Sequence, residues 1–338
     1  MDYMTKLPDT KVAHESDEDH LHFFADYEPP TDDFLADTLT GLSRKQKGIS
    51  PKYFYDQKGS ALFDAICRTP EYYVTRTELA LLDEILLEVS RLTGPDAIVI
   101  EWGSGSSWKI RKLLDGLDHP AEYIAIDISR DHLKAAAADI GRQYPDVKVG
   151  AICADFLAPI SLPPEAIVSE GRRLGFLPGS TIGNFAPHVA AEILRKAASL
   201  LGPGGAMLIG VDLEKSEDTL LAAYNDAGGI TAEFNLNLLT RMKDELGAEL
   251  DINAFEHEAI FNKEFHRIEM HLKAKTSTGI SINGSSFTFE PGETIYTENS
   301  HKFTISGFQE IAKKAGFEPG AVWSDADGLF SLHYLTLP

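Results

Sequence analysis

Short apolar runs alternate with amphipathic segments along the first two thirds of the chain. The runs at residues 97–102, 123–127, 147–153, 174–177 and 206–211 are apolar almost throughout, rather than at every second position. Between them, apolar residues recur at three- and four-residue spacing, which is typical of helices that pack through one face. Strands buried on both faces and alternating with helices predict an α/β fold with a parallel, doubly wound sheet.

Capping signals indicate where the longer helices begin and end. The segment Thr75–Glu78 has the Thr-x-x-Glu form of a capping box and precedes an apolar stripe that stops near Gly94, so we expect a helix to begin there. Gly59-Ser60 suits the start of a shorter helix. Gly202–Gly204 suits the end of a helix that starts near residue 188.

The alternation of strands and helices stops after Asp212. Two helical stretches follow, near residues 219–225 and 231–246. Residues 265–275 then alternate between apolar and polar side chains, as in an antiparallel strand with one covered face. The chain closes with a helix and a strand, at residues 306–315 and 329–337.

These patterns divide the chain into a leader and two domains. We expect residues 1–25, which are polar and carry an acidic cluster, to form a mobile or loosely packed leader. Residues 26–76 and 212–302 form the expected smaller, substrate-binding domain. Residues 77–211 and 303–338 form the expected Rossmann-like sheet domain.

Composition and charge narrow the class of partner. Of 338 residues, 43% are hydrophobic and 25% charged, which excludes global disorder. A formal charge of −21 repels phosphate backbones and anionic membranes. Cys67 and Cys153 are too few for a disulfide framework, and no apolar segment is long enough to cross a bilayer. We therefore expect a cytoplasmic protein that acts on a small molecule, with no nucleic acid, membrane or metal partner.

Three consecutive strand ends carry residues suited to a nucleotide-like ligand. In an open parallel sheet, ligands bind beyond the carboxyl ends of the strands. The turn Glu101–Gly105 reads Glu-x-Gly-x-Gly, so that its backbone can approach a ligand closely. Asp127, at the next strand end, can accept both hydroxyls of a ribose, and Asp155-Phe156 can contact an adenine.

The sequence of the Gly-rich turn distinguishes between two candidate nucleotide-like ligands. A dinucleotide requires a third glycine three positions after Gly105, where this chain has Trp108. S-adenosylmethionine has no phosphate and suits the looser turn. A structural turn with helix-capping carboxylates would also explain any one of these strand ends, but three in the right order favour S-adenosylmethionine.

Several longer motifs lie outside these strand ends. They are Lys52–Asp56 with Gly59–Phe63, Pro70–Glu78, Gly179–Asn184, Ala223–Ala227, Phe255–His257, Arg267–Met270 and Thr297–Phe303. In this order, and over nearly all of the chain after about residue 30, they resemble the histidine-specific Nα-methyltransferases of ergothioneine biosynthesis, the EgtD-like family. The resemblance implies a class I methyltransferase sheet with a second, smaller substrate domain.

The activity implied by the resemblance is transfer of three methyl groups from S-adenosylmethionine to the α-amine of free L-histidine, which gives hercynine. Two alternatives stay open. The same reaction on tryptophan, a tryptophan derivative or another amino acid would keep the sheet and change the acceptor. A non-catalytic S-adenosylmethionine-binding protein would bind the cofactor without transferring its methyl group. The sequence also leaves the oligomeric state open, a monomer included.

The resemblance also implies which residues form the site. The cofactor contacts would be Gly103, Lys109, Asp127, Asp155 and Phe156. Tyr72, Asn184 and Tyr224 would surround the α-amine and carboxylate, Glu298 and Ser300 would face the imidazole, Phe63, Gly179 and Met270 would line the pocket, and Tyr55 would lie near the reacting amine. Asn184 and Tyr55 are the expected catalytic residues.

This residue set suits methyl transfer, which is an in-line displacement at carbon. The site must hold a neutral amine on the axis of the sulfonium–methyl bond and exclude water. An uncharged acceptor such as Asn184 can orient that amine, and aromatic faces favour the cation formed by methylation. Taken alone, each residue also fits an ordinary role: Glu298 as a surface residue, Met270 as core and Asn184 as a turn residue.

Overall fold

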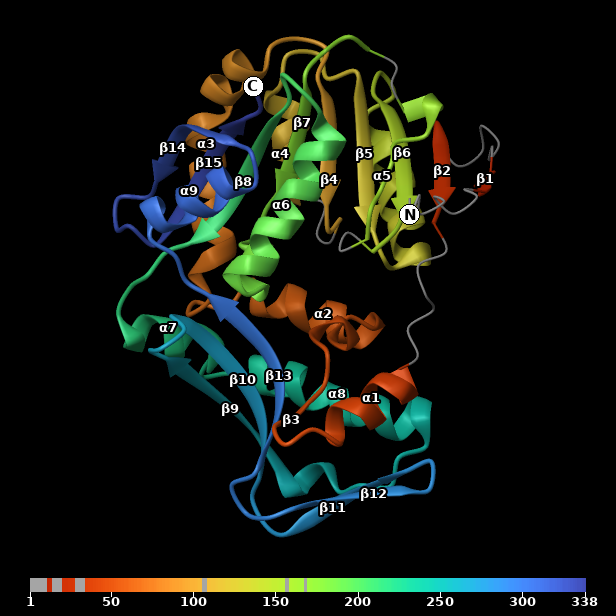
Figure 1. Ribbon diagram of the computed structural model, residues 1–338, viewed down its shortest axis with the longest axis vertical. Coiled ribbons are helices and arrows are strands. Elements are labelled where there is room, and N and C mark those ends of the chain that lie inside the picture. Colours follow the sequence, from red (N-terminus) through yellow and green to blue (C-terminus); the bar gives the residue numbers. More distant parts are fainter. Residues whose placement is uncertain (1–10, 14–19, 28–33, 105–107, 156–157, 167–168) are drawn as a thin grey trace, which may run out of the picture.

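The computed structural model describes residues 11–13, 20–27, 34–104, 108–155, 158–166 and 169–338 (Figure 1). They form a nine-stranded sheet, a four-stranded sheet and a two-stranded ribbon. Within these residues, no helix has both the length and the apolar character needed to span a membrane.

The large sheet is doubly wound. Its order is β1-β2-β6-β5-β4-β7-β8-β15-β14. The six strands from β2 to β8 in this order run parallel, whereas β1, β15 and β14 are antiparallel to their neighbours. The bounds are β1 Lys11–Ala13, β2 Phe23–Asp26, β4 Ile98–Trp102, β5 Glu122–Asp127, β6 Lys148–Cys153, β7 Arg173–Leu177, β8 Ala206–Asp212, β14 Glu318–Ser324 and β15 Phe330–Thr336.

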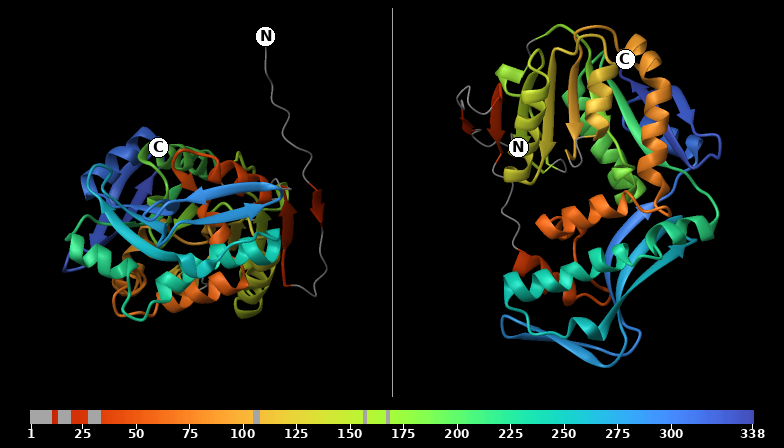
Figure 2. Two further views of the ribbon diagram at one scale, coloured as in Figure 1. Left: turned by 90° about the horizontal axis from the view of Figure 1, so that it is seen from below. Right: turned by 180° about the vertical axis from the view of Figure 1, so that it is seen from behind.

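Helices cover both faces of this sheet (Figure 2). The helices are α3 Tyr73–Thr93, α4 Trp108–Gly116 and α5 Arg130–Gln143 on one face, and α6 Pro187–Leu201 and α9 Ile305–Lys314 on the other. Side chains of β4 alternate between the two cores: Val99 lies in one, and Ile98 and Ile100 lie in the other. The apolar runs in the sequence therefore reflect burial on both faces, as expected.

The smaller sheet combines two distant segments of the chain. Its order is β3-β13-β10-β9, and β3, from the N-terminal segment, pairs in parallel with β13. Its strands are β3 Lys47–Gly48, β9 Phe255–Asn262, β10 Arg267–Ala274 and β13 Thr294–His301. Around it lie α1 Phe34–Leu42, η2 Pro51–Phe54, α2 Gln57–Ile66, α7 Glu217–Tyr224, α8 Ile230–Leu246, η5 Ile252–Ala254, and the ribbon of β11 Thr278–Ile282 and β12 Ser285–Phe289. The short 3-10 helices η3 Pro164–Ala166 and η4 Thr181–Asn184 follow β6 and β7.

The helix starts differ from those predicted. Helix α3 begins at Tyr73, so the expected capping box lies inside the helix. Glu78 is fully buried and binds Lys109 rather than the helix start. Helix α2 is capped by Asp56, whose Oδ1 accepts the Gly59 N–H at 2.7 Å, and not by Gly59-Ser60. In both cases the residue that decides the helix start lies outside the local pattern.

The leader prediction is wrong for residues 23–25. Phe23, Phe24 and Ala25 are buried in strand β2, which extends the sheet in parallel with β6. Three buried residues are too short a run to stand out in a polar segment. The strand at 265–275 also differs, because Glu269 and His271 of β10 are each only 7% exposed, so both of its faces are covered rather than one.

Candidate active site

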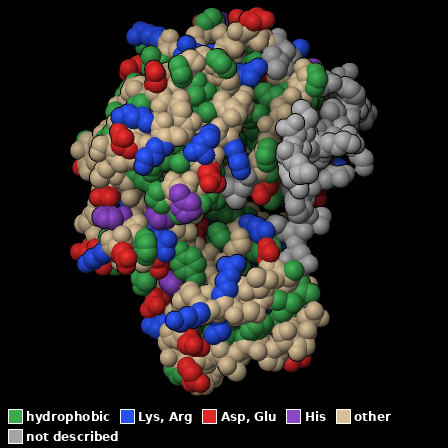
Figure 3. Space-filling view, viewed as in Figure 1, with side chains coloured by type: hydrophobic (Ala, Val, Ile, Leu, Met, Phe, Trp, Pro, Cys, Tyr) green, Lys and Arg blue, Asp and Glu red, His purple; other side chains and the backbone are tan. Residues whose placement is uncertain are grey.

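The candidate site lies where the two sheets face each other. The parallel strands of the large sheet end opposite α2 and β13 (Figure 1), the expected position for a ligand in an open α/β sheet. Figure 3 shows that the surface is hollowed between the two parts of the molecule on this face. Two of the chain crossings between the parts lie side by side, since Leu213 and Phe303 form a parallel bridge.

The turn after β4 has open space and an unpaired hydroxyl. Gly103 has φ +77, and a Cβ there would meet no atom within 4 Å. The neighbouring Ser104 Oγ is buried without a hydrogen-bond partner in the described part of the chain. Glu101 is used internally: it accepts the Tyr123 hydroxyl at 2.6 Å, and burial raises its pKa to about 8. Gly105 lies outside the described residues.

The next strand ends carry the two expected aspartates. Asp127 closes β5, and its Oδ1 accepts the Ser129 N–H at 2.8 Å. Burial raises the pKa of Asp127, although backbone N–H groups oppose the shift. Asp155 lies two residues after the end of β6. Phe156, the expected adenine contact, lies outside the described residues.

Lys109 supports the turn that follows β7. Its Nζ lies 2.6 Å from the Glu78 carboxylate, which also accepts the Gly179 N–H at 2.9 and 3.0 Å. Gly179 has φ +75, and a Cβ there would lie 3.1 Å from Lys109 Nζ. The lysine therefore has a structural partner on this turn, and its expected contact with the cofactor stays a prediction.

An aromatic cluster lines the hollow from the side of α2. The ring centroids of Tyr55 and Phe63 are 5.8 Å apart, those of Phe63 and Tyr72 are 6.3 Å apart, and those of Tyr72 and Tyr224 are 6.3 Å apart. All three pairs are edge-on, so in each pair one ring packs its edge against the face of the other. Phe234 of α8, which the sequence analysis did not select, packs 5.8 Å from Tyr55.

The Tyr55 hydroxyl lies between the two halves of the site. The side chain is 43% exposed, but desolvation still opposes the charged form of its hydroxyl. This desolvation, together with the charges of Glu298 and Asp127, raises the pKa of Tyr55 well above its usual value. One carboxylate from each sheet thus contributes to the raised pKa of Tyr55.

Strand β13 turns the polar side chains of Glu298 and Ser300 toward the site. Met270 of β10 is paired with Glu298, but the next pair joins His271 to Tyr296, so Thr297 is an extra residue on β13. Such a bulge changes the direction of the side chains beyond it. The Thr297 hydroxyl donates to the Met270 carbonyl at 3.0 Å, which holds the bulge in place.

Glu298 is a buried carboxylate without a partner. It is 9% exposed, and within the described residues it makes no hydrogen bond or ion pair. Burial raises its pKa to about 7, although the positive charge of Lys302 opposes the shift. Unpaired buried carboxylates are rare because their desolvation is costly, so this one indicates a ligand that donates a hydrogen bond.

An ionic cluster that the sequence analysis missed lies behind this strand. Asp212, at the end of β8, is 1% exposed and binds Lys215 and Lys302, each at 2.6 Å. It also accepts the Tyr73 hydroxyl at 2.8 Å. Burial alone would raise the pKa of Asp212, but the two lysines hold it below the usual value. The available signal was an acidic residue closing an apolar strand, together with Lys302 in the Thr297–Phe303 motif.

Lys302 connects this cluster to the predicted site. Its side chain is fully buried, and Nζ donates to the Ser300 Oγ at 2.7 Å and to the Tyr224 hydroxyl at 3.3 Å. Burial would lower the pKa of Lys302, but the Asp212 carboxylate raises it overall. Burial raises the pKa of Tyr224, opposed by Lys302 and Ser300. Tyr224 is therefore a neutral hydroxyl beside an ammonium ion.

Asn184 joins the large sheet to β13. It ends the helix η4, and its carbonyl accepts the Asn299 Nδ2–H at 3.1 Å. A Cβ on Gly183 would lie 2.9 Å from the His301 carbonyl oxygen, so glycine permits the close approach. The side-chain amide of Asn184 makes no hydrogen bond within the described part of the chain.

His257 holds Tyr224 from behind. Asn235 Nδ2 donates to His257 Nδ1 at 2.9 Å, so the other ring nitrogen, Nε2, donates to the Tyr224 carbonyl at 2.8 Å. Burial lowers the pKa of His257, as this neutral form requires. With both nitrogens engaged, His257 positions α7 and is not available as a base.

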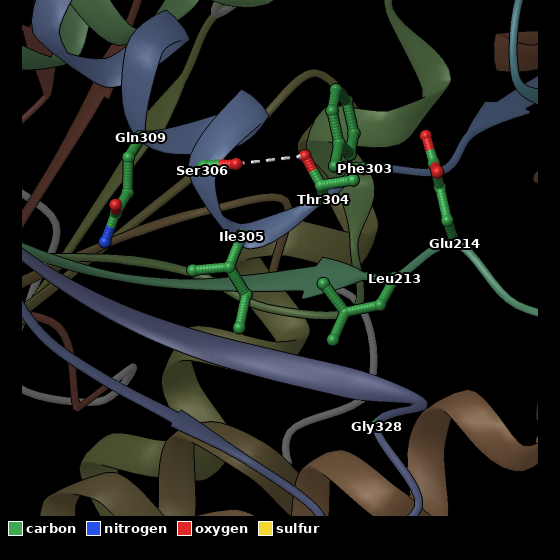
Figure 4. A pocket seen from close by; sticks show the side chains of 8 residues that line it. All are labelled: Leu213, Glu214, Phe303, Thr304, Ile305, Ser306, Gln309 and Gly328. Atoms are coloured by element: carbon green, nitrogen blue, oxygen red, sulfur yellow. Dashed lines mark hydrogen bonds between the residues drawn. The ribbon is translucent and has the colours of Figure 1, made fainter.

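A separate pocket lies beside the bridge between Leu213 and Phe303 (Figure 4). Its lining is formed by Leu213, Glu214, Phe303, Thr304, Ile305, Ser306, Gln309 and Gly328. It shares no residue with the site described above, and Glu214 is its one ionisable lining residue. The chemistry therefore belongs to the hollow between the sheets.

Known proteins resemble this chain over most of its length. Residues 34–337 match the family model described as "Histidine-specific methyltransferase, SAM-dependent". The histidine N-alpha-methyltransferase of Mycolicibacterium smegmatis is 40% identical over 302 residues, which cover 88% of this chain and 92% of that protein. Its counterpart in Mycobacterium tuberculosis is 39% identical with the same coverage. The ergothioneine biosynthesis protein 1 of Schizosaccharomyces pombe is 27% identical over 87% of this chain and 39% of that protein.

Proposed function

This chain belongs to the SAM-dependent, histidine-specific methyltransferase family, and we propose that it converts L-histidine to hercynine by three methyl transfers to the α-amine. It is an S-adenosylmethionine-dependent histidine Nα-methyltransferase. The observation that carries the assignment of its site is the convergence on one hollow of polar groups that have no partner among the described residues: the Glu298 carboxylate, the Asn184 amide and the hydroxyls of Tyr55 and Tyr72. Tyr72 and Glu298 are buried, and buried polar groups are normally paired, so a hollow that brings them together with Asn184 and Tyr55 fits a polar ligand.

The cofactor fits the ends of β4, β5 and β6. The open space at Gly103 and the Ser104 hydroxyl, which has no partner among the described residues, suit a ligand held close to the backbone. Asp127 would accept the ribose hydroxyls, with Lys109, Asp155 and Phe156 as the remaining proposed contacts. When bound, S-adenosylmethionine supplies a methyl group activated on a sulfonium.

Glu298 and Ser300 would hold the imidazole. The carboxylate accepts a ring N–H, and the Ser300 hydroxyl meets the other ring nitrogen. Met270, directly opposite Glu298, and Gly179 would set the width of the pocket. A site that pairs both ring nitrogens discriminates strongly against side chains that leave these groups unpaired.

The reacting amine would lie between Asn184 and the aromatic cluster. Asn184 Oδ1 accepts an amine N–H and so turns the nitrogen lone pair toward the methyl group, while Tyr72 and Tyr224 hold the carboxylate end. Tyr55 contributes a neutral hydroxyl next to the amine. The faces of Tyr55 and Phe63 stabilise the positive charge that accumulates with methylation.

Replacing Asn184 with alanine is expected to lower kcat by about 10-fold or more, because a misoriented amine attacks off the axis. Steady-state kinetics measure this, and thermal melting serves as the control, since the side-chain amide has no partner in the part of the chain that the structure describes. Unchanged kcat in the Asn184→Ala variant would remove Asn184 from the catalytic set.

Product mass analysis tests the function as a whole. Incubation with S-adenosylmethionine and L-histidine should yield products heavier by one, two and three methyl groups, with L-tryptophan in parallel as the rival acceptor. Methylation of tryptophan alone would reassign the substrate. Cofactor binding without methylated product would support the non-catalytic alternative.

The division of labour between the two sheets is part of the proposal. Residues 77–211 and 303–338 would bind the cofactor, and 26–76 with 212–302 would bind the amino acid. The two free thiols, Cys67 and Cys153, suit the reducing cytoplasm.

A further inference from the structure

The ammonium group of Lys302 uses all of its hydrogen-bonding capacity. It is fully buried and has three partners: Asp212 Oδ2 at 2.6 Å, Ser300 Oγ at 2.7 Å and the Tyr224 hydroxyl oxygen at 3.3 Å. A lysine ammonium has three N–H donors and no lone pair. Each of the two hydroxyls must therefore receive a hydrogen bond from Lys302 and cannot donate one to it.

Asp212 keeps this arrangement charged. Its carboxylate compensates the buried ammonium, and Lys215 compensates the rest of the aspartate from the other side. Lys215 is the natural comparison for Lys302, because it shares Asp212 but bonds to Tyr73 and the Leu213 carbonyl instead of the site hydroxyls. The chain thus contains two lysines on one carboxylate, of which only Lys302 contacts the proposed substrate-binding residues within the described part of the chain.

We propose that Lys302 is a positioning residue that orients the Ser300 and Tyr224 hydroxyls as hydrogen-bond donors toward the substrate. The field of a cation 2.7 Å behind Ser300 Oγ turns the oxygen toward the ammonium and the hydrogen away from it. In the protein without ligand, Ser300 also hydrogen-bonds to the Tyr224 hydroxyl and lowers its pKa. A ligand atom that accepts a hydrogen bond from Ser300 replaces this contact, whereas a cationic donor in front would be repelled by Lys302.

This arrangement specifies the form of the ring that the site accepts, and it rests on the proposed function. Glu298 accepts one ring N–H, whereas Ser300 presents a hydrogen to the other nitrogen, which must carry a lone pair. The site therefore selects neutral imidazole, with one donor and one acceptor nitrogen. A carboxylate of the ligand, an acceptor, likewise suits the donor hydroxyl of Tyr224.

A double-mutant cycle tests whether Lys302 acts through Ser300. Ser300→Ala in the wild-type background is expected to raise the dissociation constant for L-histidine about 10-fold, and Lys302→Met at least as much. In the Lys302→Met background, Ser300→Ala should add less than about two-fold, because the serine is no longer oriented. Titration calorimetry measures all four proteins, and kcat at saturating histidine should change far less than KM.

Lys215→Met is the matched control. It removes a lysine from the same carboxylate, so it should lower thermal stability about as much as Lys302→Met. In this background, Ser300→Ala should still raise the dissociation constant for L-histidine about 10-fold. Full additivity of Lys302→Met and Ser300→Ala, or equal coupling in the Lys215→Met background, would overturn the inference. Failure of the wild type to bind histidine would instead refute the proposed function.

A second measurement needs no variant and stays decisive even if Lys302→Met does not fold. L-3-(pyrrol-3-yl)alanine keeps a ring N–H but lacks the acceptor nitrogen, and L-3-(thiazol-4-yl)alanine keeps an acceptor nitrogen but lacks the N–H. The wild type should bind each about 10-fold or more weakly than histidine. Equal affinity for histidine and the pyrrole analogue would show that no donor faces the second nitrogen.

Discussion

Replacing Glu298 with alanine is expected to raise the dissociation constant for L-histidine by about 100-fold, while the affinity for S-adenosylmethionine changes by less than about two-fold. The carboxylate has no partner within the described residues, so the alanine variant loses its bond to the ring and breaks no structural contact. Calorimetric titration with each ligand measures both affinities. Equal loss of both would contradict the role proposed for Glu298.

The protonation of Glu298 gives this prediction a pH dependence. Burial raises its pKa to about 7, opposed by Lys302, so the carboxylate becomes protonated as the pH falls through this value. A protonated carboxyl group is a weaker acceptor, and histidine affinity should decline from pH 8 to pH 6. The matched control is Glu298→Gln, which cannot titrate. Histidine itself titrates in this range, but its titration affects both proteins equally and cancels in the ratio of wild-type to Glu298→Gln affinity. If this ratio does not change with pH, Glu298 is not the cause of the decline in affinity.

The large sheet could be predicted because its signals are local. Each parallel strand is a short apolar run, and Gly202 marks a helix end in the position expected. Where the prediction was wrong, distant partners decided the structure. Glu78 fits a capping box by spacing, yet Lys109 and Gly179, far along the chain, are its partners.

The substrate side of the site could not be predicted from periodicity. Strand β13 carries polar residues on positions that are buried, including Thr297, Glu298 and Ser300, because they face the hollow or hydrogen-bond to neighbouring elements. Such a strand lacks the apolar pattern by which strands are found. The family resemblance implied roles for Glu298 and Ser300 but none for Lys302. The role of Lys302 depends on its contact with Asp212, which exists only in the folded chain.

The Asp212 cluster combines stability with positioning. Its carboxylate lies between two ammonium groups, and Tyr73 completes its shell. Removing one partner of a buried ion pair leaves the others uncompensated, at a cost greater than the pair itself contributes. An exposed pair of similar length, Lys313 with Glu310 at 2.7 Å, carries no such cost because water solvates each charge.

Replacing Asp212 with asparagine is therefore expected to lower the free energy of unfolding by about 3–5 kcal/mol, whereas Glu310→Gln should change it far less because water solvates the exposed pair. Denaturant unfolding measures both. The two lysines hold the pKa of Asp212 below its usual value of 3.8 despite burial. The charged carboxylate therefore contributes fully to the free energy of unfolding above pH 3.8. This contribution is lost as the pH falls through the lower pKa of the folded state. The deficit of Asp212→Asn should thus persist at pH 7 and shrink in acid. A loss no larger than that of Glu310→Gln would mean that the cluster does not stabilise the fold.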